Sequence, residues 1–416
     1  MPTVREHAAA CRTASDTLRC ATGESRNAAL IAIAAALTER RADILAQNTE
    51  DMRSGRENGL RESLLDRLLL TERRITDMAA AVRQIADLPD PVGGIDQATT
   101  RPNGLQILRC RVPLGVVGVI YEARPNVTID IAALCLKSGN ACLLRGGREA
   151  IRSNRILCEI VRDALLSVGL PADAVCLVED TNRETAVEMM GLRGALDVLI
   201  PRGGAGLIQT TVENAKVPVI ETGVGNCHVY IDEEADLPMA CRIIVNAKVS
   251  RPSVCNAAET LLVARPVAAR FLPMAAEQLT ARGVSLRGCP ETVALLGSAV
   301  VPAAEEDWRE EYGDLTLAVR VVSGLYEATA HIARYGSKHS EAIVTRNYFT
   351  ARRFIDRVDA AAVYCNASTR FTDGGEFGLG AEIGISTQKL HVRGPMGLEA
   401  LTTIKYAVYG EGQIRE

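Results

Sequence analysis

The sequence predicts an α/β fold in which a mostly parallel sheet is covered by helices on both faces. Three observations lead to this class. The first ninety residues carry apolar side chains at helical spacing, the middle of the chain alternates short apolar runs with helical segments, and only 4% of residues are aromatic. Ala, Val, Ile and Leu must therefore form the core. At 416 residues the chain is too long for one typical core, so we expect two or more domains.

The elements are expected in the following order. The N-terminal region should contain helices over 28–45 and 62–85, a loop at 89–94 and a strand over 104–112. In the middle of the chain we expect strands at 115–121, 141–144, 175–178, 195–200 and 217–220, with helices at 126–137, 154–168, 185–190 and from 207 onward. A second α/β segment should run from 237 to 363, and the tail from 378 is glycine-rich and then strand-like over 401–408.

Composition and charge exclude several classes of partner. The formal net charge is −4, from 47 basic and 51 acidic residues, so nothing suggests a polyanion partner. Scarce aromatic residues argue against single-stranded nucleic acid, because such sites stack bases on aromatic rings. No apolar run approaches the length of about 18 residues that a membrane helix needs, and the N-terminus has no apolar signal segment. We therefore expect a cytoplasmic protein with no nucleic-acid or membrane partner.

Cysteine is the residue type that most needs an explanation. The chain has twelve cysteines, and none forms a CxxC pair or another zinc spacing. In a cytosolic chain most of them should be free, small and buried. We therefore expect no metal site.

Two glycine turns are candidate phosphate-binding sites. Gly203 and Gly204 follow a buried strand and open a helix, where backbone N–H groups can bind phosphate, although the full G-x-G-x-x-G fingerprint is absent and an ordinary tight turn fits as well. Gly146 is flanked by Arg145 and Arg148, where a site for NAD would offer an acidic side chain to the ribose. Arginine forks suit a phosphate, which favours NADP, and the alternative is two solvated arginines.

Cys255 is the best candidate nucleophile. It lies in a short polar turn after a helix, with the basic residues Lys248 and Arg251 nearby in sequence, and basic neighbours favour the thiolate. Position alone does not separate it from eleven other cysteines. Cys227 is a rival with an adjacent histidine, His228, but neighbours on a strand point to opposite faces and need not meet.

Other polar residues have both a structural and a functional interpretation. Asn126 follows Arg124-Pro125 at a strand-to-helix turn, where it can cap the helix or donate its amide to an oxyanion. His331 and His339 can line a cleft, or they can be structural histidines whose hydrogen bonds are satisfied within the core.

Together these segments resemble the aldehyde dehydrogenase superfamily over nearly the whole chain. The segments that carry the resemblance are Val112-Pro113-Leu114-Gly115-Val116-Val117-Gly118, Gly139-Asn140, Gly203-Gly204-Ala205-Gly206, Glu221-Thr222-Gly223 and the turn at Cys255. Glu221 precedes Cys255 by the distance that separates the superfamily's glutamate motif from its nucleophile. Glu310 looks like its ribose-binding glutamate.

The resemblance is closer to those members that reduce an acyl phosphate. It rests on Tyr121-Glu122-Ala123-Arg124-Pro125-Asn126, Arg145-Gly146-Gly147, Pro201-Arg202-Gly203-Gly204, Arg251-Pro252-Ser253-Val254-Cys255-Asn256, residues 331–343 and Gly394-Pro395-Met396-Gly397-Leu398-Glu399. It implies a Rossmann-type cofactor domain over 1–230 with a returning segment near 365–390, an α/β catalytic domain over 231–364, and a β oligomerisation arm from 98–113 and 391–416. Such an arm implies a homo-oligomer.

The resemblance also implies an activity. Cys255 would attack L-glutamyl 5-phosphate, and NADPH would reduce the resulting thioester to L-glutamate 5-semialdehyde in proline biosynthesis, where the upstream glutamate kinase is a candidate partner. It makes Asn126 a candidate oxyanion donor, although Arg124 falls nearer the slot of the superfamily's asparagine. Arg124, Lys248 and Arg251 are the candidate substrate-binding residues.

Two alternative functions stay open at this point. In an oxidative aldehyde dehydrogenase, water would take the place of phosphate, and the arginines at 145 and 148 argue against that reading. A noncatalytic scaffold on the same fold would bind no nucleotide.

Overall fold

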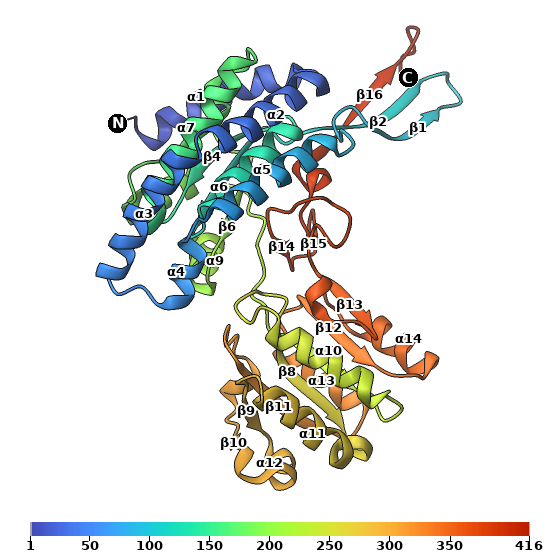
Figure 1. Cartoon of the computed structure of the whole chain (residues 1–416). Coiled ribbons are helices and arrows are strands. Elements are labelled where there is room, and N and C mark those ends of the chain that lie inside the picture. Colours follow the sequence, from blue (N-terminus) through green and yellow to red (C-terminus); the bar gives the residue numbers. More distant parts are fainter. Residues whose placement is uncertain (1, 416) are drawn as a thin grey trace. The chain divides into compact units, whose positions relative to one another are not determined.

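The computed structural model describes residues 2–415, apart from the Ser63 side chain, and these form two compact units (Figure 1). Unit 1 comprises Met1–Thr222, Gly378–Gly384 and Met396–Glu416, and unit 2 comprises Gly223–Phe377 and Ile385–Pro395. The units thus divide before residue 230, because the strand that begins at Cys227 pairs within the sheet of unit 2. The segment Gly378–Gly384, which returns to unit 1, lies within the expected range 365–390, and Met396–Glu416 also belongs to unit 1.

Unit 1 begins with helices, as predicted. They are α1 (Val4–Cys20), α2 (Gly23–Glu39), α3 (Arg41–Glu57), α4 (Glu62–Leu68) and α5 (Glu72–Asp87). The single helices expected over 28–45 and 62–85 are each broken in two. One break is at Arg40, whose guanidinium binds Glu159 and Asp163 on a later helix. The other ends at Thr71, whose side chain accepts the N–H of Arg74 and starts a new helix.

The sheet of unit 1 is parallel, with strand order β5-β4-β3-β6. Its strands are β3 (Val116–Tyr121), β4 (Ala141–Arg145), β5 (Val175–Leu177) and β6 (Val198–Arg202), and its helices are α6 (Asn126–Lys137), α7 (Ile151–Ser167), α8 (Arg183–Met190) and α9 (Ala205–Asn214). The predicted Rossmann-type βαβ arrangement is confirmed. The strand expected at 217–220 is only an isolated bridge between Leu199 and Val219, next to Pro218, which has no N–H to donate.

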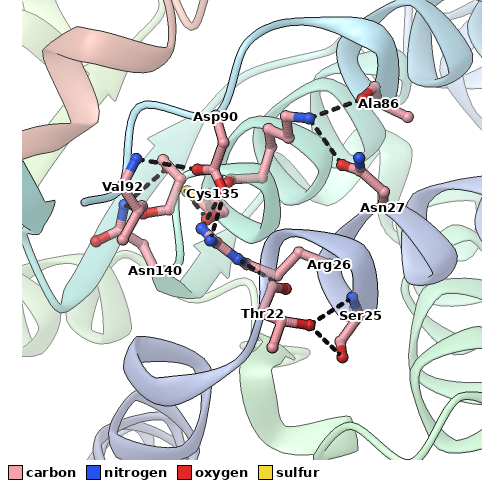
Figure 2. Close-up of polar contacts among 11 residues, drawn as sticks. Thr22, Ser25, Arg26, Asn27, Ala86, Asp90, Val92, Cys135 and Asn140 are labelled. Atoms are coloured by element: carbon pink, nitrogen blue, oxygen red, sulfur yellow. Dashed lines mark hydrogen bonds and ion pairs between the residues drawn. The ribbon is translucent and has the colours of Figure 1, made fainter. Parts of the chain in front are cut away.

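Two buried cations tie the helices of unit 1 to one another (Figure 2). Arg26, only 3% exposed, donates to Asp90 Oδ2 at 2.7 Å and to the carbonyl oxygen of Lys137 at 2.9 Å. The Lys137 ammonium donates to Asn27 Oδ1 and to the Ala86 carbonyl oxygen, each at 2.7 Å. Burial lowers the pKa of both cations. These buried polar groups hydrogen-bond to one another, and the resulting network joins α2, α5 and α6 within the interior of unit 1.

Unit 2 is built on a seven-stranded parallel sheet with the order β10-β9-β11-β8-β7-β12-β13. Its strands are β7 (Cys227–Ile231), β8 (Ala258–Ala264), β9 (Ser285–Gly288), β10 (Val300–Pro302), β11 (Thr316–Val322), β12 (Ser340–Val344) and β13 (Ala362–Cys365). Its helices are α10 (Leu237–Val249), α11 (Arg265–Thr280), α12 (Pro290–Leu296), α13 (Leu325–Tyr335) and α14 (Tyr348–Arg357). The central strands β7, β8 and β12 are buried along their whole length, as parallel strands covered on both faces must be.

A small antiparallel sheet completes the fold. It has the order β1-β2-β16, from β1 (Ile95–Thr100), β2 (Gln106–Pro113) and β16 (Thr402–Tyr409), so strands far apart in sequence lie side by side (Figure 1). A short hairpin of β14 (Ile385–Ser386) and β15 (Gly394–Pro395), which belongs to unit 2, precedes β16 in the chain. Within residues 2–415, no helix is both long and apolar enough to cross a membrane.

Candidate active site

Cys255 lies in a turn between α10 and β8 of unit 2. It is half-buried and forms no disulfide. The turn is closed by a hydrogen bond from the Ala257 N–H to the Val254 carbonyl oxygen at 3.0 Å. The short segment that carries the Cys255 thiol is therefore fixed at one end by α10 and at the other by the buried strand β8.

The backbone of Cys255 is contacted by Gly225, which lies just before β7, and by Cys227, the first residue of β7. A Cβ built at Gly225 would lie 1.7 Å from the Cys255 carbonyl oxygen, so only glycine fits there. Cys227 donates its thiol to the same oxygen at 3.2 Å. Burial raises the pKa of the Cys227 thiol well above its usual value, which keeps it protonated and able to donate.

Cys227 therefore supports the turn that carries Cys255. His228, its neighbour, faces the other way, and its Nδ1 lies 3.0 Å from Glu341 Oε2. The prediction that Cys227 and His228 need not meet is confirmed. The histidine near the Cys227 thiol is His339, with Nδ1 at 3.7 Å.

Sequence reasoning missed the segment that holds the other side of the turn. Asn256 donates its amide to the carbonyl oxygens of Thr372 at 2.9 Å and Arg370 at 3.3 Å. Thr369 donates its hydroxyl to the Asn256 carbonyl oxygen at 2.7 Å, and Arg370 donates its Nη1 to Asn256 Oδ1. These residues follow β13, more than a hundred positions after Cys255, and no spacing signal in the sequence links the two segments.

The two basic residues predicted to flank Cys255 lie in different environments. Lys248 is fully buried, and its ammonium lies 2.6 Å from Glu259 Oε2. Burial raises the pKa of the Glu259 carboxyl group, and the charge of Lys248 and its hydrogen bond oppose that rise. Lys248 thus belongs to a closed ion pair in the core, whereas Arg251 is exposed.

The glycine turn of unit 1 lies at the switch point of its sheet. The chain runs outward from β3 through β4 to β5 and then returns to β6 beside β3, and ligands of such sheets bind where this order reverses. There the Gly204 N–H, at the start of α9, donates to Glu122 Oε2 at 2.9 Å. A Cβ at Gly203 would meet the Glu122 carboxyl carbon at 2.6 Å. The turn therefore already binds an anionic group, which is the chemistry that a nucleotide phosphate needs.

The two arginines after β4 differ in accessibility. Arg145 donates its Nη2 to the carbonyl oxygens of Thr181 at 2.6 Å and Asn182 at 3.1 Å, and burial lowers its pKa. Arg148 is exposed in a single turn of 3₁₀ helix. Between them, a Cβ at Gly146 would lie 2.2 Å from Asn154 Nδ2, so the backbone approaches α7 closely.

Asn126 does not cap its helix, so that interpretation is wrong. Pro125 occupies the N-cap position, and Asn126 is the first residue of α6. Its amide donates to Asp130 Oδ2 at 2.9 Å, and burial raises the pKa of Asp130 to about 6. Arg124 is half-buried in the same loop.

The remaining predicted residues divide between the units. Glu221 is half-buried in unit 1, and Glu310 is exposed in the loop before β11 of unit 2. His331 and His339 are buried, and His331 packs against Trp308 and Tyr335, where burial lowers its pKa to about 2. Both histidines are thus core residues of unit 2. In the part of the chain that the structure describes, no group of three or more His, Cys, Asp or Glu side chains could hold a metal ion.

Comparisons with known proteins agree with this arrangement. The profile of the aldehyde dehydrogenase family matches residues 2–293. A gamma-glutamyl phosphate reductase from Moorella thermoacetica is 63% identical over 94% of this chain and 93% of its own length. One from Carboxydothermus hydrogenoformans is 60% identical over 97% of each chain.

A solved structure gives the same result in three dimensions. The crystal structure of gamma-glutamyl phosphate reductase from Thermotoga maritima superposes with a TM-score of 0.96, at 50% identity and with both chains fully covered. The chain therefore belongs to the aldehyde dehydrogenase family, and within that family to the γ-glutamyl phosphate reductases. The fold class and the resemblance predicted from the sequence are confirmed.

Proposed function

We propose that this chain reduces L-glutamyl 5-phosphate to L-glutamate 5-semialdehyde and phosphate, with NADPH, through a thioester on Cys255. The likeness to reductases of that name over nearly the full chain supports the reaction. The observation that carries the assignment to Cys255 is its position. It is a half-buried thiol on a turn whose backbone is held by Gly225, Cys227 and Asn256.

The residues then act in a simple order. The Cys255 thiolate attacks the acyl carbon, a carbon–sulfur bond forms, and the carbon–oxygen bond to phosphate breaks. Phosphate leaves as a stable anion and needs no strong general base. The Cys255 N–H and the Asn126 amide are the proposed donors to the oxyanion. Bound NADPH would supply the hydride that reduces the acyl carbon; the carbon–sulfur bond then breaks, which releases the aldehyde and returns the Cys255 thiolate, and water must be kept out until then.

The cofactor residues that we propose offer contacts suited to the phosphates and a ribose of a dinucleotide. They are Gly203 and Gly204 at the start of α9, and Arg145, Gly146 and Arg148 after β4, with Glu310 for a ribose. Arg148 is the better candidate for a 2′-phosphate, because the Arg145 guanidinium already binds two carbonyl oxygens. On this proposal unit 1 is the cofactor domain and unit 2 the catalytic domain.

For the substrate we retain two of the three predicted residues. Arg124 and Arg251 are proposed to bind its phosphate or carboxylate. Lys248 is left out, because its ammonium is enclosed with Glu259.

We also propose that the chain forms a homo-oligomer in the cytoplasm, where the upstream glutamate kinase is a candidate partner. β16 is an edge strand of the small antiparallel sheet, and Tyr406, Val408 and Tyr409 on it are more than half exposed. An edge strand with exposed apolar side chains is a surface that pairs with another chain. The sheet of β1, β2 and β16 is therefore the proposed oligomerisation arm.

The nucleophile is tested by Cys255→Ala, with Cys365→Ala as the matched control. Cys365 is also half-buried and lies in the same unit. We expect Cys255→Ala to abolish turnover while circular dichroism and melting temperature stay unchanged, and Cys365→Ala to keep turnover. Appreciable turnover by folded Cys255→Ala would remove Cys255 from the mechanism.

A further inference from the structure

Arg370 reaches both ends of the turn that carries Cys255. It lies in the 3₁₀ turn Thr369–Phe371, which follows β13 in unit 2. Its Nε donates to Ser250 Oγ at 3.0 Å, and its Nη1 donates to Asn256 Oδ1. Ser250 ends α10 and Asn256 directly follows Cys255, so one guanidinium spans the whole turn.

The contact is fixed from the other side as well. The Asn256 amide donates back to the carbonyl oxygens of Arg370 and Thr372, and the Thr369 hydroxyl donates to the Asn256 carbonyl oxygen. Asn256 is 5% exposed and Thr369 fully buried. The guanidinium of arginine is planar and rigid, so it loses little side-chain entropy for each hydrogen bond that it forms. Arg370 is therefore suited to hold the turn in one geometry.

Arg370 is also a half-buried cation whose charge interacts with Cys255. Burial and then the charge of Arg251 lower the pKa of Arg370, whereas Asp373 and the Cys255 thiol favour its charged form. A guanidinium stays charged in proteins, so this remains a fixed positive charge. The other two cations are less effective, because Lys248 is neutralised by Glu259 and Arg251 is exposed to solvent. Other titratable groups near Cys227 are His339, Tyr364, Glu259 and Glu341.

We infer that Arg370 is a positioning residue for Cys255. Its fork holds Ser250 and Asn256, and its charge stabilises the thiolate form of the nucleophile. The inference rests on the proposed function, because it requires Cys255 to be the nucleophile. It adds a residue that touches neither substrate nor cofactor and acts through the turn.

The test compares Arg370→Gln, which removes the charge, with Arg370→Lys, which keeps the charge and loses the fork. Iodoacetamide alkylation of the Cys255 peptide is followed by mass spectrometry across pH, and turnover is measured in parallel. We expect the alkylation midpoint of Arg370→Gln to rise by about one pH unit or more, because an opposite charge close to a thiol favours its ionised form. Arg370→Lys should keep the wild-type midpoint.

Turnover should respond differently from the alkylation midpoint. Both variants should lose about tenfold or more in kcat, since the turn is no longer held in one geometry. Ser250→Ala, which removes one anchor and no charge, should lower kcat without moving the midpoint. Arg353→Gln on the exposed face of α14 is the matched control and should change neither quantity.

An unchanged midpoint in folded Arg370→Gln overturns the electrostatic role, and unchanged kcat in Arg370→Lys overturns the positioning role. If Arg370→Gln does not fold, Arg370→Lys and Ser250→Ala still test the positioning role. Both must then show a lower kcat with the wild-type alkylation midpoint, and any other result overturns that role. Failure of the proposed function looks different. In that case alkylation of Cys255 would leave wild-type turnover intact.

Discussion

The close contact between Gly225 and Cys255 makes Gly225→Ala the most sensitive probe of the turn. The new Cβ would lie 1.7 Å from the Cys255 carbonyl oxygen and 2.3 Å from its Cα. Nonbonded heavy atoms rest at about 3.5 Å, so the two backbones would have to separate by roughly 1.8 Å. A displacement of about 1 Å at a reacting group can cost about a hundredfold in rate. We therefore expect kcat/KM to fall by at least about a hundredfold, or about 2.7 kcal/mol of transition-state stabilisation.

The assay is steady-state reduction of L-glutamyl 5-phosphate by folded protein, with the melting temperature measured in parallel. Gly324→Ala is the matched control in unit 2, because a Cβ there would meet nothing within 4 Å. Overpacking costs about 1–3 kcal/mol of stability, so the activity is compared per folded molecule. A Gly225→Ala enzyme with kcat/KM within about twofold of wild type would refute the argument that this backbone contact positions the nucleophile.

Three further predictions concern groups around the two sites. Glu122→Gln removes the negative charge from the side chain that accepts the Gly204 N–H. NADPH should therefore bind about threefold more tightly in a fluorescence titration. Weaker binding would contradict the assignment of this turn to a cofactor phosphate. His331 is buried in its neutral form, and its pKa is lowered from 6.5 to about 2. In the unfolded chain the same side chain takes up a proton below pH 6.5. The free energy of unfolding therefore falls as the pH drops from 6.5 towards 2. Between pH 6.5 and about pH 5, urea denaturation of the wild type should lose about 2 kcal/mol more than His331→Phe, and equal losses would show that His331 is not the group that titrates. Lys248→Met leaves Glu259 alone in the core and should destabilise the protein by about 3 kcal/mol, whereas an unchanged unfolding midpoint would mean that the pair contributes nothing.

Much of the fold follows from local sequence patterns. The apolar run of β3 predicted a strand buried on both faces, and it is buried throughout. Helix α6 has the predicted bounds 126–137, because Pro125 and Gly139 mark its two ends. The break at Arg40 could not be predicted, since no Gly or Pro marks it and the contacts that Arg40 makes to Glu159 and Asp163 span more than a hundred residues.

The candidate site shows the same division between local and distant information. Cys255 could be singled out because several motifs around it recur together in one family. Arg370 could not, because the residue it binds, Asn256, lies 114 positions earlier and only the folded sheet brings them together. Lys248 was placed near the substrate from its sequence position, but Glu259 on the adjacent strand pairs with it in the core.

The central claim is that phosphate, and not water, is the partner of the Cys255 thioester. The most direct test is the reverse reaction, in which NADP⁺ reduction by L-glutamate 5-semialdehyde is followed with and without inorganic phosphate. The account predicts NADPH formation only when phosphate is present, because phosphate must release the acyl group from Cys255. Steady turnover without phosphate would contradict it and show that water resolves the thioester, as in an oxidative aldehyde dehydrogenase.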